Sequence, residues 1–404
     1  MVALLNLYKQ SFSNLQRNIW VLSLAMFVNR SGSMVLLFTS LYMTNELHFS
    51  IGDAGVVMSL YGIGSVLGSY LGGWLTDRYS YFNIMIGALL SSGFILFLLL
   101  MIHSMIGIAI IIFMYALTAD LFRPANSKAI AVYSDAKNRT RSVSLVRLAV
   151  NLGFTVGPAV GGFVVLYLGY KWLFVIDAIT TMGAAALLYF YLPRKHVEKV
   201  PNNPAILNDK STSAYRDITY LIFIFLVALW GTCFFQIFAS IPQYFSKVCK
   251  YDEGTIGLLL ALNGFLVVLI EMPLMMKLEN KTKIFPFIRL GALLLPVSFL
   301  VLFFGKGMMI WAILYTVIIT FSEIFAMPFM MNFSLSRPHV ERQGQYSALY
   351  SISFGISNIA APLLGLGIAN AFGFDMMFVA IILMSLLAFV GFTFLGKAEL
   401  KQAS

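Results

Sequence analysis

Residues 54–79, AGVVMSLYGIGSVLGSYLGGWLTDRY, form the stretch that decides the fold. The part from 54 to 76 carries no charged side chain and reaches the length of about 20 residues that a helix needs to cross a bilayer. Gly64, Gly68 and Gly72 recur at every fourth position and therefore share one face of this helix. Small residues at this spacing let two membrane helices approach closely. The stretch predicts a membrane-spanning helix that packs tightly on a neighbour.

The composition extends this interpretation to the whole chain of 404 residues. Hydrophobic residues make up 60% and charged residues 11%, against about 45–50% and about 25% in ordinary soluble domains. Twelve apolar runs with short connections fill the length and leave no room for a sizeable soluble domain. We predict spans at 19–45, 54–76, 82–103, 105–130, 142–167, 172–192, 217–248, 253–277, 284–304, 308–335, 344–370 and 374–395.

A polar stretch with three prolines, 193–216, separates the sixth predicted span from the seventh. A shift of 202 residues, half the chain length, places Tyr42 on Tyr244 and aligns glycines of the two halves, and further along a shift of 204 places Pro124 on Pro328 and Pro158 on Pro362. The pattern predicts an all-α polytopic membrane protein with 12 transmembrane helices in two six-helix halves, 1–192 and 217–404, joined by the linker. Parallel repeats of this kind describe a known transporter architecture, with the substrate site between the halves near the midplane.

The distribution of positive charge predicts how the chain lies in the membrane. Of the 27 Lys and Arg residues, 18 fall at the termini, in the linker and in the loops of that side, whereas four fall on the opposite side. Because basic loops stay in the cytoplasm, we expect both termini and the linker to be cytoplasmic. The formal charge of +10 is spread between apolar runs, which argues against nucleic-acid binding. A bacterial inner (plasma) membrane is the simplest location.

The end of the quoted stretch, GGWLTDRY at 72–79, contains the pattern Gly-x-Leu-x-Asp-Arg. It resembles the signature between helices 2 and 3 of the major facilitator superfamily, although Ser-Tyr-Phe at 80–82 replaces the Gly and basic residues that follow there. The resemblance implies the major facilitator fold and places Asp77 and Arg78 in the cytoplasmic gate, where an acid near a helix N-terminus is favourable. A solvated Asp-Arg turn is the alternative.

A second pattern, GFTVGPAVGG at 153–162, resembles the antiporter motif of the same superfamily and matches it over ten residues. Proline bends a helix and small residues allow close packing, so we expect the motif to pack on a partner helix across the interface between the halves. As a marker it favours proton-driven export, although similar strings occur in relatives that import. The motif residues are Gly153, Gly157, Pro158, Gly161 and Gly162.

Ionisable residues inside the predicted spans are functional candidates, because each costs about 2.5–3.5 kcal/mol to insert. Glu323 has no evident partner of opposite charge, and we favour it as the proton-coupling site, with Asp120 and then Glu271 as rivals. Asp120 and Arg123 are three residues apart and can instead form a structural pair on one helix face. Arg30 and Arg123 are placed in the substrate cavity.

Bulky side chains on spans 1, 7 and 10, which line the cavity in this superfamily, suit a partly apolar ligand. Flexible thioethers and aromatic rings adapt to varied shapes. Packing within the bundle or against lipid is the alternative for each of them. The predicted cavity residues of this kind are Met34, Trp230, Phe234, Gln236 and Met327.

These features favour a secondary active transporter over an enzyme. The sequence contains no phosphate-binding loop, catalytic triad spacing or zinc motif, and we expect no cofactor. The first hypothesis is proton-coupled export of a small amphipathic molecule, similar to the twelve-helix drug:proton antiporters. A proton-coupled importer of a metabolite such as a siderophore or peptide is the alternative, whereas a membrane enzyme or a channel is disfavoured. A site between the two halves lets a monomer work, with substrate, protons and the lipid bilayer as partners.

Overall fold

The computed structural model describes residues 15–134, 139–194, 214–278, 284–305, 307–337 and 343–402, and no strand occurs in these ranges. Twelve helical segments of this part are long and apolar enough to cross a membrane. Each overlaps one predicted span, so the predicted number and order of membrane helices are confirmed. The segments are Arg17–Glu46, Ile51–Thr76, Tyr81–Leu99, Met105–Tyr133, Leu145–Leu168, Lys171–Tyr191, Ile218–Lys247, Glu253–Glu271, Phe285–Phe304, Met309–Ser334, Ala348–Phe372 and Phe374–Glu399.

The helices gather into two compact units, each of which has its own packing. The first unit takes the described residues of 15–38 and 63–194, and the second takes those of 39–62 and 214–402. The segment Thr39–Gly62, which ends span 1 and begins span 2, thus packs with the C-terminal helices. The division of the chain into two six-helix halves at the linker stays a prediction.

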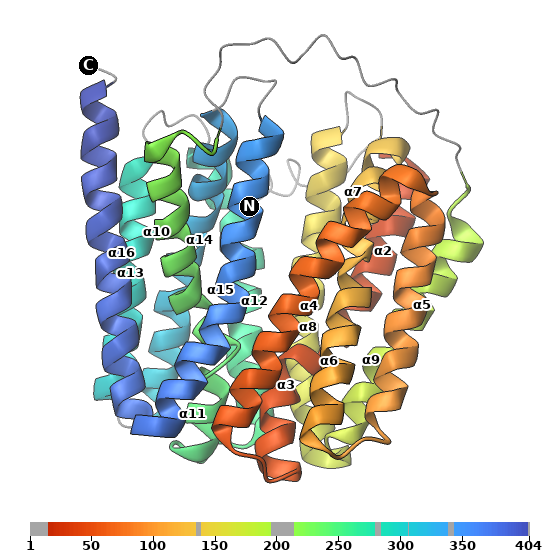
Figure 1. Cartoon of the computed structure of the whole chain (residues 1–404), viewed down its shortest axis with the longest axis horizontal. Coiled ribbons are helices and arrows are strands. Elements are labelled where there is room, and N and C mark those ends of the chain that lie inside the picture. Colours follow the sequence, from red (N-terminus) through yellow and green to blue (C-terminus); the bar gives the residue numbers. More distant parts are fainter. Residues whose placement is uncertain are drawn as a thin grey trace, which may run out of the picture. The chain divides into compact units, whose positions relative to one another are not determined.

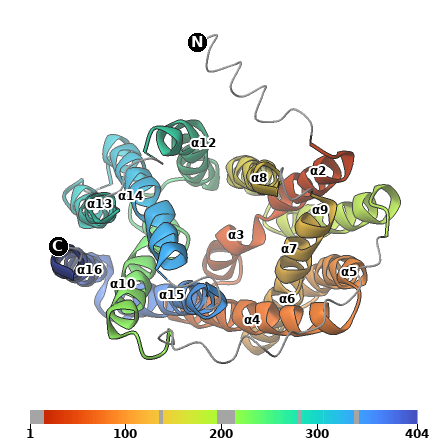
Figure 2. The same ribbon diagram turned by 90° about the horizontal axis from the view of Figure 1, so that it is seen from above.

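In the first unit, α5 packs on α6, α7 and α9 (Figure 2). Helix α2 packs on α8 and α9 of the same unit. The elements of this unit are α2 (Arg17–Gly32), the beginning of α3 (Val35–Leu41), the second part of α4 (Ile51–Arg78), α5 (Tyr81–Leu99), α6 (Met105–Asp120), α7 (Phe122–Tyr133), α8 (Arg139–Leu168) and α9 (Lys171–Tyr191).

The glycine face of α4 lies against the backbone that runs from α6 into α7. A Cβ atom added at Gly64 would lie 2.5 Å from the carbonyl oxygen of Phe113, and one at Gly72 would lie 2.7 Å from that of Leu121. Gly68 faces the backbone between these two contacts. Any side chain larger than hydrogen would push the helices apart, so the predicted tight contact is confirmed.

The second unit has an aromatic core, in which the ring of Phe223 lies with its centroid 4.6 Å from that of Phe333 and 6.1 Å from that of Phe392. Helix α16 runs along α13 and α10 (Figure 1). The elements of this unit are η1 (Tyr42–Glu46), the first part of α4, α10 (Ile218–Phe234), η3 (Phe235–Ile237), α11 (Ile241–Lys247), α12 (Glu253–Leu278), α13 (Phe285–Phe304), α14 (Met309–Ser336), α15 (Gln343–Phe372) and α16 (Phe374–Gln402).

Spans 1 and 7 are interrupted at positions that the sequence repeat relates. In span 1 the first helix, α2, ends at Gly32, and the second helix, α3, begins at Val35. In span 7 the 3₁₀ turn η3 separates α10 from α11. The offset of 202 residues places Ser33 on Phe235, the first residue of η3. In transporters, such interruptions free backbone groups near a binding site. They therefore direct attention to the side chains around Ser33.

Candidate functional site

The interruption of span 1 is held by a carboxylate from span 6. Asp177 on α9 is 1% exposed. Its Oδ2 accepts a hydrogen bond from the backbone N–H of Val35 at 3.4 Å, and its Oδ1 accepts one from the Thr181 hydroxyl at 3.2 Å. The Thr181 oxygen accepts in turn from the side-chain amide of Asn29 at 3.2 Å. Asp177 thus accepts a hydrogen bond from a backbone N–H in the first turn of α3, where such groups have no acceptor within the helix. Lipid could not supply that acceptor.

Arg30 lies in the last turn of α2, directly before the interruption. The central carbon of its guanidinium group is 5.4 Å from the centroid of the Phe154 ring. Its Nε atom is buried and has no hydrogen-bond partner in the described part of the chain, and the same holds for the Ser31 hydroxyl. Asp177 influences Arg30 through its charge but, among the described residues, forms no ion pair with it.

The antiporter-like stripe of α8 packs on this same segment of span 1. A Cβ atom at Gly153 would lie 2.5 Å from the Cβ of Arg30, and one at Gly157 would lie 3.2 Å from the Arg30 carbonyl oxygen. At Gly161 the nearest atoms belong to Phe38 and Met34. The glycines therefore make room for an irregular helix of their own unit. The expectation that they pack on a partner in the other half is wrong, because their shared face points at span 1.

Pro158 and Gly162 lie on the same long helix. Pro158 sits inside α8 rather than at its end, where its ring removes one backbone donor. Gly162 is buried one position beyond the last glycine of the stripe. Their part in a gate stays a prediction.

Asp120 and Arg123 form the structural pair that their spacing allows. The Arg123 Nε lies 2.8 Å from the Asp120 carboxylate, whose side chain is 8% exposed against 62% for the arginine. Ser65 on α4 donates a further hydrogen bond to Asp120. The charge of Asp120 at the end of α6 is thus balanced by Arg123 at the start of α7, within the same span, and the cavity role of Arg123 stays a prediction.

Glu323 lies near the middle of span 10 and has a different environment. The side-chain amide of Asn263 on α12 donates to its Oε2 at 3.1 Å and to the hydroxyl oxygen of Thr320 at 3.0 Å. No described residue forms an ion pair with Glu323. Its embedded carboxylate therefore has a neutral hydrogen-bond donor and, within the described ranges, no ion-pair partner. Glu271, at the end of span 8, is partly buried, and its like charge reaches Glu323.

The predicted cavity residues of span 7 are packed inside the second unit. Trp230 and Phe234 stack with their ring centroids 5.1 Å apart, and both side chains are at most 1% exposed. Gln236 donates to the Ala361 carbonyl oxygen at 2.9 Å and accepts from the Ser240 hydroxyl at 2.5 Å. It thereby ties the interrupted part of span 7 to span 11. Substrate contact by these side chains stays a prediction.

The two predicted cavity methionines lie in different units. Met34 is 2% exposed and abuts the glycine stripe of α8. Met327 on α14 is partly buried, and its carbonyl oxygen accepts from the Tyr350 hydroxyl at 3.3 Å. Neither position tests the predicted substrate contact.

The gate motif forms the last turn of α4, which runs through Arg78. The Arg78 guanidinium stacks over the Trp74 ring at 4.0 Å. Lys128 on α7 donates to the Thr76 carbonyl oxygen at 2.9 Å, which places a cation at the negative end of the α4 dipole. The Asp77 side chain lies outside the described residues. The gating role of Asp77 and Arg78 stays a prediction.

A polar network joins η1 to α11 and α12 in the second unit. Lys247 donates to the Asn45 side-chain oxygen at 2.7 Å, and the Asn45 amide donates to Ser246 and Glu253 at 3.2 Å each. Beside it, Gln243 donates to the Thr44 hydroxyl oxygen at 2.9 Å. These contacts fasten the end of span 1 to the end of span 7.

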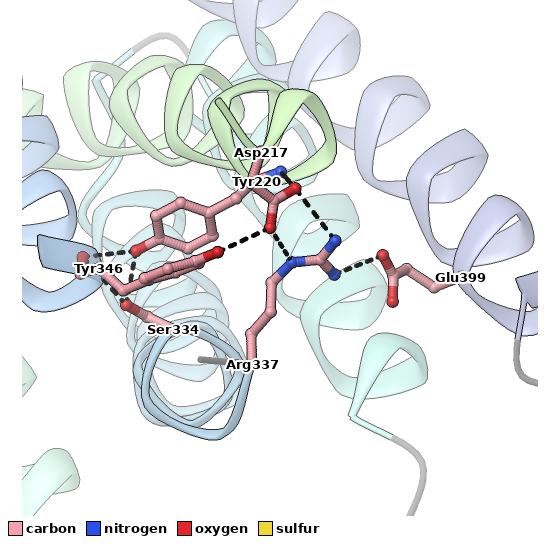
Figure 3. Close-up of polar contacts among 6 residues, drawn as sticks. All are labelled: Asp217, Tyr220, Ser334, Arg337, Tyr346 and Glu399. Carbon is pink, nitrogen blue, oxygen red and sulfur yellow. Dashed lines mark hydrogen bonds and ion pairs between the residues drawn. The ribbon is translucent and has the colours of Figure 1, made fainter. Parts of the chain in front are cut away.

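A second polar cluster lies at the opposite end of the C-terminal helices (Figure 3). Arg337 donates two hydrogen bonds, of 2.7 and 3.2 Å, to the Asp217 carboxylate and one of 2.6 Å to Glu399. The Tyr346 hydroxyl also donates to Asp217, at 3.0 Å. Burial raises the pKa of Asp217, but the bonds from Arg337 and the Tyr220 backbone outweigh it and hold that pKa below its ordinary value. The cluster clamps the ends of α10, α14, α15 and α16 together.

Reasoning from the sequence missed Asp177, Asn263 and Lys128. Asp177 interrupts the apolar run WLFVIDAITTMG and is a further acid well inside a predicted span, beside Asp120, Glu271 and Glu323. Asn263 likewise interrupts LLALNGFLVV. A lone polar residue in an apolar run was the available signal. Its partners depend on helix packing, which the sequence does not display.

Known transporters resemble this chain over most of its length. A Na⁺, Li⁺, K⁺/H⁺ antiporter of Planococcus maritimus is 26% identical, with 93% of this chain and 94% of that protein covered. An uncharacterised MFS-type transporter of Bacillus subtilis is 22% identical, with 96% and 97% covered. Among solved structures, a nucleoside transporter, NupG, has a TM-score of 0.80 at 13% identity, with 95% of this chain and all of that chain (100%) covered. A peptide transporter bound to alafosfalin has a TM-score of 0.79 at 16% identity, with 96% of each chain covered.

The sequence family can now be assigned. The model of the Major Facilitator Superfamily matches residues 22–362, which include the gate motif, the glycine stripe and Glu323. The relatives are transporters rather than enzymes, and the solved structures share the fold of this chain. The chain is an integral multi-pass membrane protein that belongs to the major facilitator superfamily.

Proposed function

We propose that this secondary transporter exports a small amphipathic molecule in exchange for protons, and that Glu323 carries the proton. The observation that supports this is the environment of Glu323, whose carboxylate has the Asn263 amide as its hydrogen-bond donor and no ion pair among the described residues. A charged carboxylate is costly inside a bilayer. Gain or loss of a proton at this position therefore changes the energy of the second unit strongly.

The contrast with Asp120 favours this assignment. Asp120 is held by Arg123 at 2.8 Å and by Ser65, so its charge is already compensated within the first unit. Protonating it would break that pair and leave Arg123 without its partner. Glu323 can take up a proton without breaking an ion pair, which suits a group that must load and unload a proton in each cycle.

In the proposed cycle the two halves alternate between states that open to either side of the membrane. Protonation of Glu323 favours one state and the bound substrate favours the other, so each ligand shifts the population that the other needs. Both termini face the cytoplasm and a monomer suffices in this proposal. The basic loops on that side support the orientation.

One relative suggests alkali cations as a second substrate class to test. The Planococcus maritimus protein is a Na⁺, Li⁺, K⁺/H⁺ antiporter. Glu323 and Thr320 present oxygen atoms, which hard cations prefer as ligands. Exchange of an alkali cation for a proton is therefore the second candidate function, with the same coupling residue.

The test uses the purified full-length chain in liposomes with a pH-sensitive dye inside. Cationic dyes, siderophores, dipeptides and alkali cations are added in turn under an imposed pH gradient. Substrate and proton moving in opposite directions would establish exchange and name the substrate class. Movement in the same direction would refute export and support the importer.

Two variants test the coupling residue. Glu323→Gln should abolish substrate-dependent proton movement, whereas Asp120→Asn should retain it. Glu46→Gln is the matched control, because Glu46 is an exposed acid at the end of η1. If Glu323→Gln folds and moves protons at the wild-type rate, the assignment of Glu323 is wrong.

A further inference from the structure

Arg30 poses a problem that the proposed proton site does not solve. It lies near the middle of span 1, where a charged side chain is expensive. Its Nε atom is buried without a hydrogen-bond partner in the described chain, and its guanidinium group lies over the face of Phe154. Buried polar atoms are nearly always hydrogen-bonded, and an exception needs an explanation.

The adjacent Ser31 repeats the observation, because its hydroxyl is also buried without a partner in the described ranges. Two donors on consecutive residues are thus unsatisfied at one point of the first unit, beside the interruption of span 1. The glycine stripe of α8 allows the backbone of these residues to lie close to it: a Cβ at Gly157 would be 3.2 Å from the Arg30 carbonyl oxygen and 3.3 Å from that of Ser31.

The nearby acid does not satisfy these donors. Asp177 directs its two oxygens at Val35 and Thr181. Its charge reaches Arg30, but within the described residues the two form no ion pair. The segment therefore offers a guanidinium group and a hydroxyl, both hydrogen-bond donors, and no described residue supplies an acceptor bonded to the Arg30 Nε or to the Ser31 hydroxyl.

We propose that Arg30 and Ser31 bind an anionic oxygen group, such as a carboxylate, on the transported molecule. The inference deepens the proposed function, on which it rests, by making the substrate an amphipathic organic acid or zwitterion. A guanidinium group binds carboxylate oxygens through paired, charge-assisted hydrogen bonds, and the hydroxyl adds one further donor. Phe154 beside the guanidinium supplies an apolar surface for the rest of the ligand.

Asp177 acts in this proposal as a positioning residue with a competing charge. Its hydrogen bond from Val35 stabilises the interruption of span 1, and its negative charge partly offsets the positive charge of Arg30. Removing its charge while keeping its shape should therefore strengthen anion binding. If Arg30 and Asp177 had only a structural role, changing either of them would weaken anion binding. The two substitutions thus have opposite expected signs.

The test measures binding of three probes with one apolar body: 2-naphthoate, 2-naphthalenemethanol and 2-naphthylmethylammonium. The full-length protein is purified in lipid nanodiscs, and dissociation constants are obtained from Trp fluorescence quenching. The wild type should bind naphthoate about tenfold more tightly than the alcohol, as one charge-assisted contact predicts. Arg30→Gln should remove this preference, and Arg30→Lys should keep part of it. Asp177→Asn should strengthen naphthoate binding severalfold.

Arg289→Gln is the matched control, since Arg289 is an exposed arginine on α13 of the other unit. Its binding should equal that of the wild type. The proposal is overturned if the wild type does not prefer naphthoate, if Arg30→Gln keeps the preference, or if Asp177→Asn weakens naphthoate binding as Arg30→Gln does. Proton exchange in liposomes is recorded separately. Anion preference without proton exchange would refute the proposed coupling and leave the anion site standing.

Discussion

The contact between the glycine stripe and span 1 can be tested with a graded series of glycine substitutions. In Gly153→Ala the new methyl group would lie 2.5 Å from the Arg30 Cβ and 3.0 Å from two backbone atoms, so the helices must shift. Overpacking of this kind costs about 1–3 kcal/mol, from which a helical Gly→Ala gain of about 0.5–1 kcal/mol is subtracted. We expect a net loss of about 0.5–2 kcal/mol.

Gly157→Ala and Gly87→Ala provide the comparison. At Gly157 the nearest atoms would be 3.2 and 3.3 Å away, so a shift of a few tenths of an ångström suffices and the net change should be close to zero. At Gly87 on α5 nothing lies within 4 Å of the added atom. That variant should show the helical gain alone, about 0.5–1 kcal/mol of added stability.

The measurement is the free energy of unfolding in a fixed mixture of detergent and lipid, with the same denaturant for all three variants. The order Gly87→Ala, Gly157→Ala, Gly153→Ala from most to least stable would support the packing described. Equal stability of the Gly153→Ala and Gly87→Ala variants would refute it, because the stripe would then not lie on span 1.

Two further predictions concern the polar clusters of the second unit. Because the pKa of Asp217 is lowered in the folded protein, its contribution to stability is fully present above the unfolded pKa of about 3.9 and is lost as the pH falls through the lower folded pKa. In Arg337→Gln the folded pKa of Asp217 rises toward the unfolded pKa, so the stability measured above about pH 4 should fall and should depend less on acid pH. An unchanged pH profile would contradict the bond between Arg337 and Asp217. Asn45→Ala removes the acceptor of Lys247 and the donor to Ser246 and Glu253, which should cost about 1–3 kcal/mol and speed amide hydrogen exchange of Tyr42–Glu46. Asn358→Ala, at an exposed position whose side chain donates to the Phe354 carbonyl oxygen of its own helix, should leave that exchange unchanged.

The sequence predicted the membrane helices well because their signal is local. Each span needs about 20 apolar residues whatever its neighbours are, and the described spans overlap every predicted one. The tight packing of Gly64, Gly68 and Gly72 was predictable for the same reason, since their spacing alone puts them on one face. Which helix receives that face is not a local property. The sequence therefore did not show that the glycine stripe of α8 packs on span 1 rather than on a helix of the other half.

The candidate site was only partly predictable, because its chemistry depends on an interruption of a helix. Periodicity places Arg30 near the middle of span 1 but does not show that the helix ends two residues later. Without that ending, the backbone N–H of Val35 has no need of Asp177. The same limit applies to Glu323, whose hydrogen bond from Asn263 depends on how α12 packs on α14 and could not be predicted from the sequence.

The repeat explains the scaffold of the two units but not their charges. The offset of 202 residues that aligns the interruptions of spans 1 and 7 places Arg30 on Thr232 and Glu323 on Leu121. At these positions the first unit has a guanidinium group where the second has a hydroxyl, and the second has a carboxylate where the first has an apolar side chain. If the anion and the proton are handled by different units, neither site needs to bind both ligands. Their competition must then act through the movement of the units, and Arg30→Gln should weaken substrate binding without changing how Glu323 takes up its proton in the unloaded protein.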